Sequence, residues 1–257
     1  MRAKLLAAIG QCFFGIAMIV FGVQQCVYAV AGGVVFGPPW IVRLPVVTGI
    51  VGLIVALAGL SILTRYKAHI GGDLLACVLI VYVLAIFVPR LLVTPRNPGL
   101  WSGLGELLCM AGAALVAAGM DSSGAMQSPA GNSRSNLINL GHILYGAPLI
   151  IFGLQHLMYA RFVATLVPAW IPARLFWACF VGVSFFAASL SIITRVQGVL
   201  AASLLGLMFF IWVLIVHVPR IILAMQNANE WTSGLVALAM SGGAFLMTTV
   251  EPRKHAI

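Results

Sequence analysis

Charged residues are scarce in this chain. Only 7% of its 257 residues are Asp, Glu, Lys or Arg, and 62% are hydrophobic. A soluble domain carries about 25% charged residues, so the composition excludes a soluble globular protein. The uncharged apolar runs reach the roughly 20 residues that a helix needs to cross a hydrocarbon core of about 30 Å. We therefore expect an integral membrane protein that contacts lipid.

Several kinds of functional group are also missing. The five cysteines are isolated, without a C-x-x-C pair or metal-ligand spacing, which argues against a dithiol centre and a metal site. The sequence has no P-loop, no G-x-S-x-G motif and no series of membrane acids that would suit a proton pump. Its basic residues lie mostly singly at helix ends and form no patch for nucleic acid. We predict no catalytic residue of a familiar kind and no nucleic-acid partner.

What the chain does contain is a duplication. Residues 21–29 (FGVQQCVYA) return as residues 152–160 (FGLQHLMYA), and residues 61–65 (SILTR) return as 191–195 (SIITR). Residues 88–90 (VPR) likewise return as 218–220. Such self-similarity is typical of a tandem repeat. Polar residues kept in both copies are expected to serve a need of the repeated unit.

The apolar runs predict eight membrane helices, four in each repeat. Residues 1–120 form the first repeat and 137–257 the second, and residues 121–136 form a Ser- and Gly-rich flexible linker. An even number of crossings makes the repeats parallel, so we predict an all-α integral membrane fold of two four-helix bundles. The predicted helices are Leu5–Ala29, Pro45–Leu63, Leu74–Leu92, Trp101–Met120, Leu137–Ala160, Ala173–Ile193, Val199–Leu223 and Trp231–Thr248. A small excess of Lys and Arg on one side predicts that both termini lie in the cytoplasm.

Repeated polar and aromatic residues gather at helix ends on the side opposite the termini. They form two equivalent candidate clusters for binding a ligand. The first cluster comprises Gln24, Gln25, Tyr28, Trp40, Arg90 and Trp101, and the second comprises Gln155, His156, Tyr159, Trp170, Arg220 and Trp231.

Two further residues extend these clusters. His217 lies one turn before Arg220, and Glu106 lies about a turn after Trp101. An acid at membrane depth needs a partner, for which Arg90 is the candidate. Structural roles remain open as alternatives: an interfacial belt for the tryptophans, snorkelling for the arginines and interhelical hydrogen bonds for the glutamines.

The pattern F-G-x-Q-H-x-x-Y-A, followed by P-x-W-x-P and a late P-R, resembles the DoxX-like family. In this chain it runs from Phe152 to Ala160, continues at Pro168, Trp170 and Pro172, and ends at Pro219-Arg220. The second repeat matches along its length, while the first is a looser copy with Gln25 in the place of His156. The resemblance implies a small bacterial inner-membrane subunit associated with quinone-linked sulfur oxidation or with thiol and oxidative-stress pathways.

The leading hypothesis is a non-catalytic membrane subunit or docking partner of a quinone- or thiol-linked redox system. It would bind a quinone or similar amphiphile at the second cluster and would associate with a soluble or membrane oxidoreductase. A transporter or permeability protein for a small solute or lipid is the alternative from another class, because parallel repeats are common in transporters. A membrane scaffold without a ligand is the third possibility.

Overall fold

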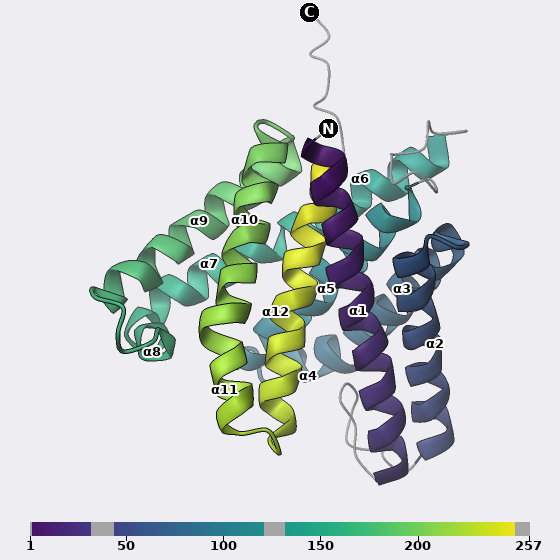
Figure 1. Cartoon of the computed structure of the whole chain (residues 1–257), viewed down its shortest axis with the longest axis horizontal. Helices are drawn as coiled ribbons and strands as arrows, with labels where there is room; N and C mark the ends of the chain where they lie inside the picture. Colours follow the sequence, from purple (N-terminus) through teal and green to yellow (C-terminus); the bar gives the residue numbers. More distant parts are fainter. Residues whose placement is uncertain (1, 32–43, 121–131, 250–257) are drawn as a thin grey trace, which may run out of the picture.

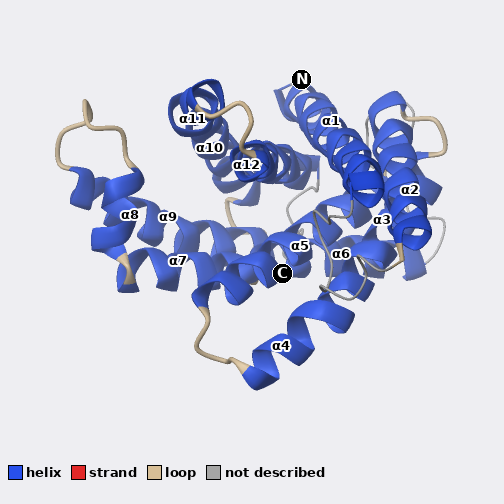
Figure 2. Ribbon diagram, turned by 90° about the horizontal axis from the view of Figure 1, so that it is seen from below, coloured by secondary structure: helices blue, strands red, loops and turns tan. Residues whose placement is uncertain are grey.

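The chain is helical throughout the part that the structure describes. The computed structural model describes residues 2–31, 44–120 and 132–249, and these residues form no β-strand (Figure 1; Figure 2). The first repeat contains α1 (Arg2–Ala31), α2 (Pro45–Thr64), α3 (Ala68–Tyr82), the π-helical turn η2 (Val83–Phe87), α4 (Val88–Val93) and α5 (Pro98–Ala118). The second contains α6 (Asn132–Gly146), α7 (Pro148–Met158), α8 (Ala160–Leu166), α9 (Arg174–Thr194), α10 (Gly198–Trp212), the π-helical turn η3 (Val213–His217), α11 (Val218–Leu223), α12 (Ala228–Leu246) and the 3-10 turn η4 (Met247–Thr249).

Eight helical segments are long and apolar enough to cross a membrane, which confirms the predicted fold class. They are Ala3–Val30, Pro45–Thr64, Ala68–Val93, Pro98–Ala118, Arg134–Met158, Arg174–Thr194, Gly198–Leu223 and Ala228–Thr249. Large apolar side chains stand on their outer surfaces, such as Val46 at 73% exposure and Leu190 at 66%. Such surfaces suit contact with lipid, where helices satisfy their own backbone hydrogen bonds. The chain is a multi-pass integral membrane protein, and the parallel relation of the repeats stays a prediction.

The first crossing of the second repeat is interrupted, whereas that of the first repeat is continuous. We predicted one helix, but α6 ends at Gly146 and α7 begins at Pro148. Proline lacks the N–H that would bond to the preceding turn, and its ring clashes with that turn. The equivalent position in the first repeat is Ala17, and α1 runs unbroken past it. α6 also begins at Asn132, inside the predicted linker, whose residues 121–131 lie outside the described part.

The repeated Val-Pro-Arg sequence follows a π-helical turn in both repeats. η2 ends at Phe87, directly before Val88-Pro89. η3 ends at His217, directly before Val218-Pro219. Proline removes a donor and pushes on the turn before it, which accounts for the local widening. Tyr82 ends α3 directly before η2. Single π turns often accompany functional sites, and Tyr82 lies directly beside this one.

The repeated Ser-Ile-x-Thr-Arg sequence ends the second helix of each repeat. The hydroxyls of Thr64 and Thr194 donate to the carbonyl four residues earlier, at 2.8 and 2.7 Å, and accept from the N–H two residues later. Arg65 and Arg195 take left-handed backbone angles, with φ of 62° and 63°, and so terminate the helices. Their side chains tie each hairpin to the first helix of its repeat, through Gln11 and Asn139 respectively. This motif therefore has a structural role.

The two repeats exchange helix contacts with each other. α1 packs against α2 of its own repeat and against α12 of the other, while α5 packs against α3 and against α6 (Figure 1; Figure 2). Glycines at equivalent positions make both crossings possible: Gly10 faces Gly242, and Gly112 faces Gly141. Small residues let membrane helices approach closely. An ion pair of 2.8 Å between Arg134 on α6 and Asp73 on α3 adds a polar link between the repeats.

Candidate functional site

The predicted tryptophans at the starts of α5 and α12 hold the preceding loops. Trp101 donates its indole N–H to the carbonyl of Pro95 at 2.8 Å, and Trp231 donates to Met225 at 2.9 Å. The two bonds lie at equivalent positions of the repeats. Both side chains are partly exposed, as is typical of residues at the interface between lipid and water. Anchoring of a loop explains why these tryptophans recur.

Gln155 joins the two repeats. Its amide donates to the carbonyl of Pro98 at 2.8 Å and accepts from the hydroxyl of Ser102 at 2.7 Å. Both partners lie in the first turns of α5, beside Trp101. The sequence grouped Gln155 with Trp231 of its own repeat, whereas the exchange of helices places it against the first repeat. Gln155 thus makes interhelical hydrogen bonds of the kind that stabilise membrane bundles.

This bond predicts a measurable coupling between Gln155 and Ser102. Gln155→Leu and Ser102→Ala should each lower the free energy of unfolding by about 1 kcal/mol. The free energy of unfolding of the double variant should fall by less than the sum of the two single decreases, because both substitutions remove the same hydrogen bond. Unfolding in detergent gives the three values. Ser184→Ala is the control, because that hydroxyl bonds only within its own helix, and strict additivity of Gln155→Leu with Ser102→Ala would contradict the assignment.

His156 is packed among aromatic rings. Its Nδ1 lies 2.8 Å from the carbonyl oxygen of Phe152, one turn earlier on α7. The imidazole stacks on Trp212 with centroids 6.1 Å apart and meets Phe185 edge-on at 5.1 Å. The ring is therefore supported by its own helix and by neighbouring rings, as a structural bundle histidine would be.

Other predicted residues lie toward the surface. Tyr159 is 41% exposed and Trp170 is 72% exposed. Arg90 is exposed, and Arg220 is half-buried. Trp40 lies outside the described residues.

The remaining predicted residues lie on several different elements. His217 lies against α12, where a Cβ added to Gly234 would meet it at 3.4 Å. Gln24 and Tyr28 are half-buried on α1. Among the described residues no ion pair joins Glu106 to Arg90; the ion pair found there joins Arg134 to Asp73.

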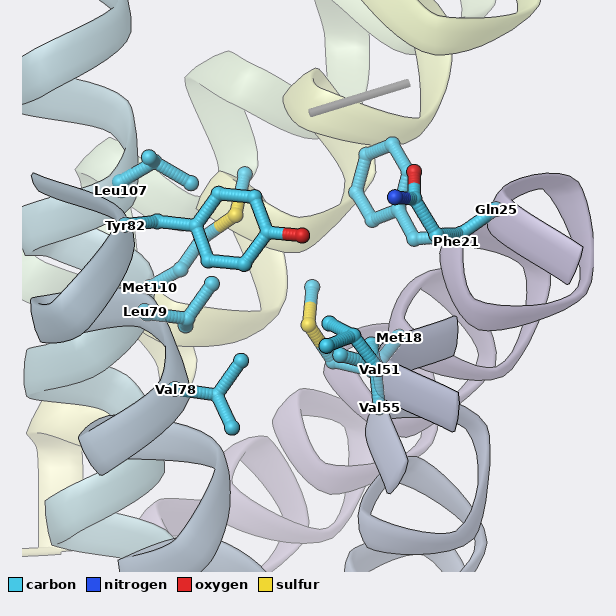
Figure 3. A pocket seen from close by; sticks show the side chains of 10 residues that line it. All are labelled: Met18, Phe21, Gln25, Val51, Val55, Val78, Leu79, Tyr82, Leu107 and Met110. Carbon is cyan, nitrogen blue, oxygen red and sulfur yellow. The ribbon is translucent and has the colours of Figure 1, made fainter. Parts of the chain in front are cut away.

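A cavity instead lies inside the first repeat, between α1, α2, α3 and α5 (Figure 3). Its volume of about 20 Å³ suits one water-sized group. The side chains that line it are Met18, Phe21 and Gln25 of α1, Val51 and Val55 of α2, Val78, Leu79 and Tyr82 of α3, and Leu107 and Met110 of α5.

Tyr82 brings a polar group into this apolar space. The residue is 8% exposed, and within the described part of the chain its hydroxyl has no hydrogen-bond partner. Figure 3 shows the hydroxyl pointing into the cavity, with the amide of Gln25 directed at the same space from α1. Burying a hydroxyl without a partner costs about 1–3 kcal/mol. The cavity is therefore suited to a ligand with a hydrogen-bonding tip.

Part of the cavity lining lies near the outside of the bundle, on α2 and α3. Most of its lining is buried, including Met18 and Met110 at 1% exposure. Val51, Val55 and Val78 are half-buried, so the lining reaches the surface at these three side chains. α2 and α3 belong to segments long and apolar enough to span a membrane, so this part of the lining lies close to the lipid-facing side of the bundle.

Sequence reasoning did not identify this site. Tyr82 was not a candidate, and Gln25 was placed in the first cluster, at the ends of the helices. A signal was nevertheless present, because Tyr82 lies 14 residues (82 − 68) into the span Ala68–Val93, or about 21 Å along the helix. A polar group at that depth calls for a partner or a function.

Comparisons of the chain with known protein families, with curated proteins and with solved structures found no match. Across the described residues there is no group of three or more His, Cys, Asp or Glu that could hold a metal ion. The Tyr82 cavity and the chemistry of its lining are the features that bear on function.

Proposed function

We propose that this protein is a non-catalytic, DoxX-like membrane subunit of a quinone-linked redox system, and that it holds a quinone or similar amphiphile in the first repeat. The observation that carries the proposal is the buried hydroxyl of Tyr82, which points into an apolar cavity lined in part by half-buried side chains of α2 and α3. This location differs from the second cluster that the sequence suggested. The resemblance to the DoxX-like family supports the redox setting.

The chemistry of a quinone fits this arrangement. A quinone carbonyl accepts a hydrogen bond from the phenol of Tyr82, and this bond removes the cost of leaving the hydroxyl unpaired. The cavity is large enough for that oxygen, and the apolar ring would pack beside the half-buried side chains of Val51, Val55 and Val78. Ligand sites commonly combine an apolar wall with a few polar groups that fix orientation. A lipid-soluble ligand would reach this site directly from the bilayer.

The cellular setting is part of the same proposal. The protein resides in the bacterial inner membrane with both termini in the cytoplasm, and a soluble or membrane oxidoreductase is its partner. Its cysteines are unpaired and separated along the chain, which favours a quinone-linked role over disulfide exchange.

Tyr82→Phe tests the proposal, since it removes the hydroxyl and keeps the ring. Binding of a short-chain benzoquinone to the full-length protein in nanodiscs should weaken roughly five- to tenfold, the worth of one hydrogen bond of about 1 kcal/mol. Isothermal titration calorimetry measures this. Tyr159→Phe is the matched control from the second predicted cluster, and its affinity should equal that of the wild type.

Two results would count against the proposal. A wild-type protein that binds no benzoquinone saturably excludes the quinone function. Binding that is weakened by Tyr159→Phe but not by Tyr82→Phe returns the site to the second cluster.

A further inference from the structure

The space equivalent to the first repeat's cavity can be located in the second repeat by the duplication itself. Residues of α1 correspond to residues 131 positions later, and residues of α2 and α3 to residues 130 positions later. Val55, which lines the cavity from α2, thus corresponds to Phe185 on α9. The two repeats place side chains of very different size at the same position.

Phe185 lies at the centre of an aromatic cluster. It is 1% exposed, and its ring centroid lies 5.1–6.1 Å from those of four other rings. These rings belong to Phe152, His156, Phe209 and Trp212.

The four neighbours of Phe185 occupy the positions of four residues that line the cavity. Phe152 corresponds to Phe21, His156 to Gln25, Phe209 to Leu79 and Trp212 to Tyr82. The phenyl ring of Phe185 therefore fills the space that the short side chain of Val55 leaves open.

The polar groups differ in the same way. Tyr82 and Gln25 direct a hydroxyl and an amide into the open space of the first repeat (Figure 3). At the equivalent positions, Trp212 and His156 stack on one another with their planes 11° apart. The second repeat thus has neither the space nor the phenol.

We infer that the chain binds one ligand, in the first repeat only, and that Val55 is the residue that keeps this site open. The inference rests on the proposed function and adds a stoichiometry and a specificity-determining residue to it. The ligand is an amphiphile whose hydrogen-bond-accepting tip passes Val55 to reach Tyr82. The second repeat keeps the fold while an aromatic side chain permanently occupies its equivalent space.

Val55→Phe transfers the filled state to the first repeat. We expect short-chain benzoquinone to saturate the wild-type protein at one molecule per chain and to show no saturable binding to Val55→Phe. Native mass spectrometry and equilibrium dialysis of the full-length protein in nanodiscs give the stoichiometry. Val46→Phe is the matched control. It introduces the same side chain on the same helix, α2, at a position that is 73% exposed and faces lipid. It should bind as the wild type does.

A smaller change guards against misfolding of Val55→Phe. Val55→Leu partly fills the cavity and should weaken binding at least threefold, while its unfolding temperature stays within 2 °C of that of Val46→Phe. Equal affinities for Val55→Leu, Val55→Phe and wild type would overturn the role of Val55.

The stoichiometry separates failure of this inference from failure of the proposed function. Two molecules per wild-type chain would overturn the inference and leave the quinone function standing. No saturable binding to the wild type would overturn the proposed function and the inference together. A third outcome would also overturn the inference. If the wild type binds one molecule per chain, and Phe185→Val loses this binding while Val55→Phe keeps it, the site lies in the second repeat.

Discussion

Gly112→Ala is expected to lower the unfolding temperature of this protein by about 6–12 °C. A Cβ at this position of α5 would lie 2.4 Å from the carbonyl oxygen of Gly141 and 2.7 Å from the N–H nitrogen of Tyr145. Both are backbone atoms of α6, so no side chain can rotate away and the two helices must separate. Overpacking of this kind costs up to about 3 kcal/mol, and each kcal/mol shifts the midpoint by roughly 2–4 °C for a chain of this size.

The duplication supplies an independent repeat of that experiment. Gly242→Ala on α12 should cost a similar amount, because its Cβ would lie 2.5 Å from the backbone nitrogen of Phe14. Gly49→Ala is the control on a membrane helix, since its nearest heavy atom would be 3.9 Å away. Thermal unfolding in detergent, followed by tryptophan fluorescence, measures all three. Midpoints for Gly112→Ala and Gly49→Ala that agree within 1 °C would refute the close crossing.

Phe185→Ala should produce a loss of comparable size, about 3–5 kcal/mol. The substitution removes one buried ring from contact with four others, and each aromatic pair adds about 0.5–1.5 kcal/mol beyond simple burial. In lipid the loss arises mainly from missing packing contacts, so the bundle cannot recover it by exposing the site to the bilayer.

Phe162→Ala provides the comparison for Phe185→Ala. Phe162 on α8 is 65% exposed, so its removal should leave the midpoint almost unchanged. The same unfolding measurement applies to both variants. If Phe185→Ala unfolds within 2 °C of Phe162→Ala, the second repeat does not depend on its aromatic cluster.

Sequence reasoning predicted the helices well because uncharged apolar runs of membrane length have few structural alternatives. It missed the break before Pro148, although proline is a known helix breaker, because the uncharged apolar run continues across this position. It also could not foresee that α1 packs on α12. That packing depends on how Gly10 and Gly242 face each other, which hydropathy does not encode.

The candidate clusters were chosen from residues that recur in both repeats, and several recurring residues make structural contacts. Trp101 and Trp231 hold loops, and Arg65 and Arg195 hold the ends of helices. The cavity arises where the repeats differ, at Val55 and Phe185. In a duplicated chain, shared residues maintain the common scaffold, and a specialised site is better sought among the substitutions between copies.

The packing of α1 against α12 also has a consequence for biosynthesis. Of the described helices, α1 leaves the ribosome first and α12 last. At about 5–20 residues per second, synthesis of the intervening chain takes on the order of tens of seconds. During that time α12 is not yet available to cover the surface of α1 around Gly10, and this surface contacts lipid or the insertion machinery. Closure of the bundle is therefore a late event, and it waits for the last transmembrane helix to enter the bilayer.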